Sequence, residues 1–305
     1  MKIAVLLCLL IFNQTVGKAK SALAQVIVAH RGASADAPEN SISSFNLAWK
    51  QGADAVEGDF YLTADKHIVC IHDKDTQRVS GEDLEVSEST LEVLQKLDVG
   101  SWKGPQFCNE RMPTLQEVLA VIPSGKILYI EIKCGPEILP YLKPLLMGSK
   151  LEAQQLRIIS FNKDVIRTSK LVMPSIEAYW LVDFQKDNDK GLWYPSVDVI
   201  VDVAQRIGAD GVDVRAKMDL LDPQFISRCQ EAGLSLHAWT VDDSNDAREL
   251  QRLGFDSITT NRPEFLRQAI SQLENMRSGT SSFQTPAVSH TERPSSAIRM
   301  EASTE

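Results

Sequence analysis

Short apolar runs separated by turn residues repeat along most of the chain, with helix-like segments between them. The runs predict nine strands, at residues 25–29, 54–62, 67–72, 127–132, 156–160, 176–181, 211–214, 235–240 and 257–260. The intervening segments predict helices at residues 41–51, 88–97, 115–122, 137–147, 163–171, 197–208, 223–232, 244–253 and 263–273. Alternation of strands and helices is typical of βαβ units and a parallel sheet.

The second and third predicted strands are joined by only four residues, 63–66. A parallel crossover takes a dozen or more residues, so these two strands must form an antiparallel hairpin. Eight parallel strands remain, which predicts a TIM (β/α)8 barrel with a short hairpin excursion after the second strand. A doubly wound open sheet is the alternative. A turn centred on residues 63–66 would place His72 opposite Glu57 and so beside the acids of the second strand.

Both ends of the chain lack the alternating pattern. Residues 3–12 are an apolar run, too short for the roughly 20 residues that span a bilayer, and Ala22-Leu23-Ala24 resembles a cleavage site. We therefore predict a signal peptide at 1–24, and export to the periplasm or the medium without stable membrane insertion. An N-terminal core element is the alternative. Residues 277–305 hold eleven Ser or Thr and predict a flexible tail, which leaves 25–276 as the barrel domain.

Charge and cysteine content narrow the function classes. The chain carries 41 acidic and 32 basic residues, which argues against nucleic acid or an anionic membrane as a partner. A phosphate-bearing substrate would have to be attracted by local charge or a metal. Beyond the leader the cysteines are irregularly spaced and contain no CxxC, so free or buried thiols are favoured over disulfides. The sequence contains neither a GxSxG nucleophile elbow nor a GxxxxGK[ST] phosphate loop.

Four polar clusters interrupt the apolar strands near their C-terminal ends. They are His30-Arg31-Gly32, Glu57-Gly58-Asp59, His72-Asp73 and Glu131-Ile132-Lys133. In a barrel these ends share the face where catalytic groups collect. Because side chains alternate along a strand, Glu57 and Asp59 point the same way, as do Glu131 and Lys133.

Glu57, Asp59 and Glu131 would crowd three carboxylates at the barrel mouth. Unpaired, they would repel one another, and a divalent cation relieves that repulsion. An all-oxygen ligand set suits Ca²⁺ or Mg²⁺ better than Zn²⁺. The alternative is simple ion pairing, for instance between Glu131 and Lys133.

The remaining polar residues suggest phosphoryl chemistry. His30 and His72 suit a general acid and base near neutral pH. Arg31 offers a bidentate fork to a phosphate, and Lys133 adds a point charge to the same anion. Gly32 suits a sharp turn after His30. Trp239, at the end of a late strand, either walls the substrate pocket or packs in the core.

These motifs resemble the glycerophosphodiester phosphodiesterase family. The matching segments are HRGASADAPENS (30–41), EGDFYLTAD (57–65), IVCIHD (68–73), MPTLQEVL (112–119), YIEIK (129–133), ISF (159–161) and AWTV (238–241). Together they cover essentially all of residues 26–266, in order and with matching spacing. The sequence departs from the family pattern at four residues: Ser41 stands where Thr is usual, Asp242 where Asn is common and Asn261 where Asp is usual, and Cys134 directly after Lys133 is uncommon.

The resemblance implies a TIM barrel that hydrolyses glycerophosphodiesters to sn-glycerol 3-phosphate and an alcohol. It implies one cation, Ca²⁺ or Mg²⁺, on the three acids, and His30 and His72 as the acid–base pair in either order. It also implies substrate contacts from Arg31 and Lys133, supported by Glu39 and Asn40.

Two other functions stay open. A lysophospholipase D or sphingomyelinase D would need an apolar groove at the mouth, and a non-catalytic binding barrel would use the tail as a tether. The alcohol moiety, the choice of metal and the oligomeric state are not fixed by the sequence.

Overall fold

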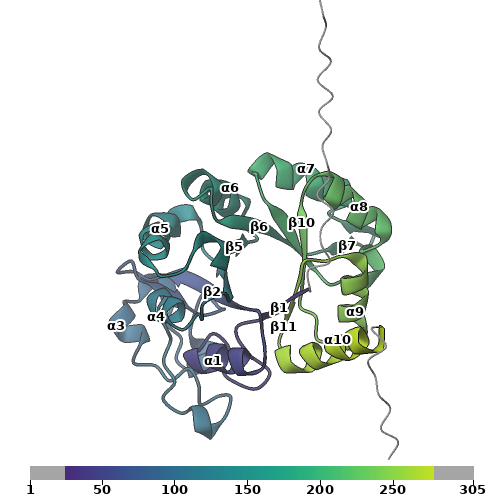
Figure 1. Cartoon of the computed structure of the whole chain (residues 1–305). Coiled ribbons are helices and arrows are strands. Elements are labelled where there is room, and N and C mark those ends of the chain that lie inside the picture. Colours follow the sequence, from purple (N-terminus) through teal and green to yellow (C-terminus); the bar gives the residue numbers. More distant parts are fainter. Residues whose placement is uncertain (1–24, 278–305) are drawn as a thin grey trace, which may run out of the picture. The chain divides into compact units, whose positions relative to one another are not determined.

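The computed structural model describes residues 25–277 of the 305-residue chain. Within them, eight parallel strands close into a ring in the order β1, β2, β4, β5, β6, β9, β10 and β11, and β11 pairs back with β1 (Figure 1). Their bounds are Val26–Ala29, Ala55–Leu62, Ile127–Ile132, Leu156–Ser160, Glu177–Val182, Gly211–Arg215, Ser235–Trp239 and Ser257–Thr260. The closed ring confirms the predicted (β/α)8 barrel and excludes the open sheet.

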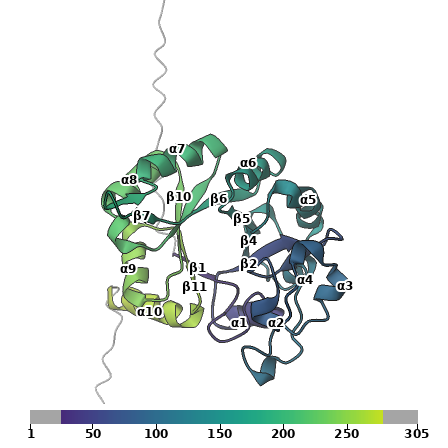
Figure 2. The same cartoon turned by 180° about the vertical axis from the view of Figure 1, so that it is seen from behind.

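Helices follow the strands along the chain and surround them in both views (Figure 2). They are α1 Ile42–Lys50, α2 Gln77–Ser80, α3 Leu91–Leu94, α4 Leu115–Ala120, α5 Leu139–Gly148, α6 Lys163–Val172, α7 Val197–Ile207, α8 Pro223–Glu231, α9 Ser244–Leu253 and α10 Pro263–Arg277. Short 3₁₀ turns lie at Val86–Glu88, Pro105–Phe107, Pro136–Ile138, Ala153–Gln155 and Met218–Leu220.

The ends of the chain are outside this description except for the last helix. The leader predicted for residues 1–24 lies outside the described residues, and of the tail predicted for 277–305 only Arg277 lies inside, as the final residue of α10. Residues 25–270 belong to one compact unit that contains the barrel, and the end of α10 belongs to a second.

Local capping explains where the first helix begins. The Ser41 hydroxyl accepts a hydrogen bond from the Ser44 amide at 3.1 Å, and the Ser44 hydroxyl accepts one from the Ser41 amide at 3.3 Å. This reciprocal pair satisfies two amides that the helix cannot pair internally. Ser41 therefore caps the helix, whereas Asn40 directs its side chain to Asp59 on β2.

The hairpin between β2 and β3 (Ile68–Cys70) is present and antiparallel, as predicted. Its register is one residue off, however, because Phe60 pairs with Cys70 and Leu62 with Ile68. Lys66 adopts a left-handed conformation, φ 67°, which adds a residue to the turn. The exact pairing of His72 with Glu57 is therefore wrong by one residue. His72 lies just beyond the end of β3 and lines the same cavity as Glu57, so its predicted place near the acids is confirmed.

Two local predictions differ from the structure. The helix expected at residues 88–97 is the single turn α3, because Thr90 is extended and the chain turns helical only at Leu91. A second hairpin, β7 Gln185–Asp187 with β8 Leu192–Tyr194, was not predicted. Its side chains are mostly exposed, so it lacks the buried alternation that signals a strand.

The strands have two buried faces. Leu128, Ile130 and Ile132 of β4 join the large apolar cluster that includes the helices, while Tyr129 belongs to a smaller interior cluster. Alternation therefore sends every second residue into the barrel, where Glu131 follows Tyr129. All cysteines in residues 25–277 are free thiols, which confirms that prediction.

The first barrel turn yields a stability test. Gly32 has φ +78°, and a Cβ there would lie 2.3 Å from the Ser44 hydroxyl. We expect Gly32→Ala to lower the free energy of unfolding by about 3 kcal/mol, combining left-handed strain with overpacking. Urea unfolding measures this loss.

Gly233→Ala is the matched control, because Gly233 has φ +75° and open space around it. It should cost only the backbone strain, about 1 kcal/mol. Equal losses in the two variants would contradict the packing argument at Gly32.

Candidate active site

The C-terminal ends of the barrel strands surround a cavity of about 280 Å³. His30 follows β1 directly, and His72 follows the hairpin strand β3. Most of the residues predicted from sequence line this cavity: His30, Arg31, Glu57, His72, Glu131, Lys133 and Trp239. The sequence motifs therefore converge on one face, as the barrel prediction required.

The three acids lie together and are almost completely buried. Glu57 and Asp59 are on β2, Asp59 is the register partner of Glu131 on β4, and one oxygen from each lies within 4.8 Å of the others. Burial, and then repulsion from the other two acids, raises the pKa of Glu57 well above its usual range. Burial and Asp59 raise the pKa of Glu131 to about 7.

The oxygens of this cluster fit a divalent cation. Glu57 Oε1 and Asp59 Oδ1 are buried and accept no hydrogen bond within the described chain. Asp59 Oδ1 lies 3.3 Å from Lys133 Nζ, an ion-pair distance without hydrogen-bond geometry. Unsatisfied buried carboxylate oxygens are costly, and an all-oxygen set of three acids matches the ligands of hard cations. Glu57, Asp59 and Glu131 are the residues that would hold the ion.

Two basic side chains balance the acids. Lys133 Nζ lies 2.8 Å from Glu131 Oε1, and Arg31 Nε lies 3.2 Å from Asp59 Oδ2. Burial opposes the charge on Asp59, but Lys133 and Arg31 outweigh it and hold its pKa below the usual range. The two predicted phosphate ligands are therefore already fixed beside the acids.

Left-handed backbone at two residues directs this arrangement. Arg31 has φ 56°, and its amide donates to Glu57 Oε2 at 2.9 Å. Asn40 has φ 57°; its Nδ2 donates to Asp59 Oδ2 at 2.8 Å, and its Oδ1 accepts from the Asp59 amide at 3.1 Å. Such conformations cost non-glycine residues about 1–2 kcal/mol each, so the contacts they make must compensate.

Glu39 and Asn40 lie behind the cavity wall rather than on it. Glu39 Oε1 accepts from Arg31 Nη1 at 3.0 Å, and Asn40 also accepts from the Cys70 thiol at 3.2 Å. Glu39 thus holds Arg31, which lines the cavity, and Asn40 holds Asp59 of the acid cluster. Direct contact of Glu39 or Asn40 with substrate stays a prediction.

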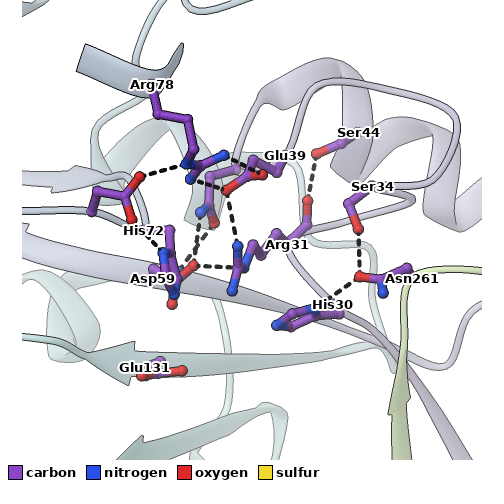
Figure 3. A network of polar contacts seen from close by, with 12 residues as sticks. His30, Arg31, Ser34, Glu39, Ser44, Asp59, His72, Arg78, Glu131 and Asn261 are labelled. Carbon is purple, nitrogen blue, oxygen red and sulfur yellow. Dashed lines mark hydrogen bonds and ion pairs between the residues drawn. The ribbon is translucent and has the colours of Figure 1, made fainter. Parts of the chain in front are cut away.

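A chain of ion pairs ties His72 to Arg31 (Figure 3). His72 Nδ1 lies 2.7 Å from Asp73 Oδ1, and Arg78 Nε lies 2.6 Å from Asp73 Oδ2. The guanidinium of Arg78 also donates to both oxygens of Glu39, at 2.8 and 3.0 Å. Burial opposes the charge on Asp73, but His72 and Arg78 outweigh it and lower its pKa. Because Asp73 is an anion, Nδ1 of His72 carries the proton.

His30 is held by Asn261, which is held in turn by Asp242. Its Nδ1 lies 2.8 Å from Asn261 Oδ1, while Asn261 Nδ2 donates to Asp242 Oδ2 at 2.6 Å. Relative to the pattern that the sequence resemblance implies, the acid and the amide are exchanged within this contact. Asn261 presents its oxygen to His30, so Nδ1 is the donor and Nε2 keeps the lone pair. Burial, and then Arg31, lowers the pKa of His30 to about 4.

Aromatic side chains form the far wall. Trp239 lines the cavity, its indole nitrogen donates to the Asp213 carbonyl at 3.1 Å, and its ring meets Phe161 edge-on at 5.5 Å. Trp239 therefore lies in the cavity wall, which is one of the two places predicted for it. Contact of Trp239 with substrate stays a prediction.

Sequence reasoning missed Arg78 and Asp213. Arg78 lies on the one-turn helix α2 in a polar connection, where a basic residue resembles any solvated side chain. Asp213 is a single acid within the apolar run of β9, and it lines the cavity. An acid inside a predicted buried strand is the signal that could have found it.

Comparison with known proteins places the chain among similar sequences and structures. Residues 30–265 match the sequence model of the glycerophosphoryl diester phosphodiesterase family. YhdW of Bacillus subtilis is 35% identical over 252 residues, which cover 79% of this chain and 96% of YhdW. A glycerophosphodiester phosphodiesterase of Caldanaerobacter subterraneus is 32% identical over 245 residues, with the same coverage of 79% and 96%. A phosphodiesterase of Oleispira antarctica, solved with the product sn-glycerol-3-phosphate, has a TM-score of 0.71 and 28% identity over 81% of this chain and 96% of that one.

The exchanged pair around His30 gives a titration test. A lowered pKa means that His30 binds a proton only in acid, so we expect a midpoint near pH 4 by NMR of the imidazole ring. The double variant Asn261→Asp with Asp242→Asn places a carboxylate on Nδ1 and should raise the midpoint by about one unit.

A His30→Gln spectrum assigns the signal. A wild-type midpoint near the ordinary value of about 6.5 would contradict this account of His30. The same midpoint in the wild type and in the double variant would also contradict it.

Proposed function

The chain belongs to the glycerophosphoryl diester phosphodiesterase family, and on that basis we propose that it binds one divalent cation, Ca²⁺ or Mg²⁺, on Glu57, Asp59 and Glu131. It is a glycerophosphodiester phosphodiesterase, which forms sn-glycerol 3-phosphate and an alcohol. The observation that carries this function is the convergence of three buried acids, two histidines, Arg31 and Lys133 on one cavity. When bound, the cation would supply charge stabilisation to the phosphate oxygens.

His30 is proposed as the general base. Its hydrogen bond to Asn261 fixes the proton on Nδ1, and its lowered pKa keeps Nε2 unprotonated near neutral pH. The positive charge of Arg31 beside His30 contributes to this lowering of its pKa. Nε2 can therefore take the proton of the attacking hydroxyl. Attack by water gives sn-glycerol 3-phosphate directly, whereas attack by the neighbouring glycerol hydroxyl gives a cyclic phosphate that water must then open.

His72 is proposed as the general acid. The Asp73 carboxylate lies 2.7 Å from Nδ1, and Arg78 holds that carboxylate in place, so the ring is oriented with Nε2 free of this contact. His72 would donate a proton from Nε2 to the oxygen of the leaving alcohol as the P–O bond breaks. The sequence leaves the order of the two histidines open, and their different partners support this one.

Arg31 and Lys133 stabilise the phosphate. Both line the cavity, and their side chains are only 18% and 15% exposed. Preorganised positive groups in a site of low water content stabilise the charge that develops on the phosphoryl oxygens. The acids that fix the two side chains also keep them charged.

Export remains a proposal that rests on the apolar run at 3–12 and the Ala22-Leu23-Ala24 pattern, which lie outside the described residues. Within residues 25–277, no helix has the length and apolar character needed to cross a membrane. A periplasmic or secreted enzyme would meet glycerophosphodiesters outside the cytoplasm.

The function predicts a cation-dependent assay. We expect release of sn-glycerol 3-phosphate from glycerophosphocholine and glycerophosphoethanolamine with Ca²⁺ or Mg²⁺, loss of release in EDTA, and recovery when cation is added in excess. A coupled glycerol 3-phosphate assay measures the rate, and lysophosphatidylcholine serves as the test for a lysophospholipase D. A rate of glycerol 3-phosphate release that is the same with and without EDTA would refute the proposed cation. Cleavage of lysophosphatidylcholine alone would favour a lysophospholipase D.

The acid–base pair has a matched control on the same hairpin. His72→Ala should lower kcat by about 10²- to 10⁴-fold while the fold persists. His67→Ala removes a half-exposed histidine before β3 and should leave the rate unchanged. A folded His72→Ala enzyme of near-normal rate would remove His72 from the mechanism.

A further inference from the structure

Asp213 lies on the strand opposite the catalytic acids. In the closed ring, β9 is four strands from β2 in either direction. Val212 and Val214 belong to the apolar cluster outside the barrel, so Asp213 between them faces the interior. It lines the same cavity as His30 and His72, and it is 1% exposed.

The carboxyl group of Asp213 has no partner in the described chain. Its Oδ1 is buried without a hydrogen bond, and neither oxygen forms an ion pair among residues 25–277. Trp239 binds the backbone carbonyl of Asp213 and leaves the carboxyl group unused. Burial, and then repulsion from Glu131, raises its pKa well above the usual range. A buried carboxyl group with no partner destabilises a fold, so packing does not explain its presence.

Within residues 25–277, the side chains around Asp213 supply no hydrogen-bond donor to its carboxyl group, so a bound ligand is the remaining source of one. Asp213 has two register partners: Leu181 on β6, which is apolar, and His237 on β10, whose ring nitrogens pair with the Ser257 and Ser235 hydroxyls. The indole nitrogen of Trp239 is already bonded. The phosphate ligands Arg31 and Lys133 lie with the acids of β2 and β4, across the cavity. A diester held there extends beyond its phosphate, and its other polar groups are hydroxyls or an amine.

We propose that Asp213 binds a hydrogen-bond donor of the substrate, an O–H or N–H outside the phosphate, on the wall opposite the catalytic acids. This inference rests on the proposed function. The donor has two possible sources, the glycerol hydroxyls and the alcohol moiety. Asp213 thus contributes to substrate recognition at the expense of stability.

Asp213→Leu tests the proposal, because leucine has nearly the shape of aspartate without its polar atoms. We expect kcat/KM to fall about tenfold or more, since a buried hydrogen bond to substrate is lost. The substrates are glycerophosphoethanolamine, glycerophosphocholine and the methyl ester of glycerol 3-phosphate. A loss on all three assigns the glycerol hydroxyls, and a loss confined to the ethanolamine ester assigns the amine.

Two further measurements separate recognition from structure. Asp213→Leu should raise the melting temperature, because an unsatisfied carboxyl group leaves the interior. Asp213→Asn, which keeps an acceptor, should recover much of kcat/KM. The matched control Asp183→Leu removes an acid that pairs with Arg215 at 3.1 Å and does not line the cavity, so kcat/KM should stay unchanged.

Binding is measured as well, so that failure of the proposed function is distinguishable. Calorimetry on the His72→Ala background compares affinity for the same three esters with and without Asp213→Leu. Absence of wild-type turnover would refute the proposed function, while the binding comparison still decides the role of Asp213. Unchanged affinity and kcat/KM on every ester, or a lower melting temperature in Asp213→Leu, would overturn the proposal.

Discussion

The repulsion among three buried carboxylates at the barrel mouth is the constraint on which the rest of the site depends. Glu57, Asp59 and Glu131 place oxygens within 4.8 Å of one another in a volume that excludes most water, where like charges interact strongly. Several groups form ion pairs or hydrogen bonds with these acids: Lys133, the side chain and amide of Arg31, and Asn40. Arg31 and Asn40 make these contacts from a left-handed backbone conformation. The contacts with the acids therefore compensate for backbone strain at both residues.

The same constraint organises the groups around the acids. Glu39 fixes Arg31 and is itself held by Arg78, which also orients Asp73 and thereby His72. One guanidinium thus joins Arg31, the proposed phosphate ligand, to the proposed general acid His72. On the other side, Asn261 fixes the ring of His30 without offering it a charge. The two histidines therefore differ in their partners, a neutral amide and a carboxylate, and this difference supports the separate roles proposed for them.

Much of this could be read from the sequence, for physical reasons. Period-two runs with short or long connections determine which strands are parallel, so the barrel and its hairpin were predictable, and strand ends bring His30, Glu57 and Glu131 to one face. The register of the hairpin was not predictable, because one left-handed residue in its turn, Lys66, shifts every residue pair between β2 and β3. Arg78 and the contact between Asp242 and Asn261 depend on side chains far apart in sequence. Asp213 gave a visible signal, an acid in a buried strand, but only the closed ring shows what it faces.

The central claim is that the buried acids bind one cation in exchange for protons. Isothermal titration of Ca²⁺ and of Mg²⁺ into the protein, in buffers of different ionisation enthalpy, measures both quantities. Because burial raises the pKa of Glu131 to about 7 and that of Glu57 above its usual range, binding should release protons at pH 6, release fewer at pH 8.5, and tighten as the pH rises. We expect one ion per chain, and none in Glu57→Gln. Binding that releases no protons, or that persists unchanged in Glu57→Gln, would contradict the account.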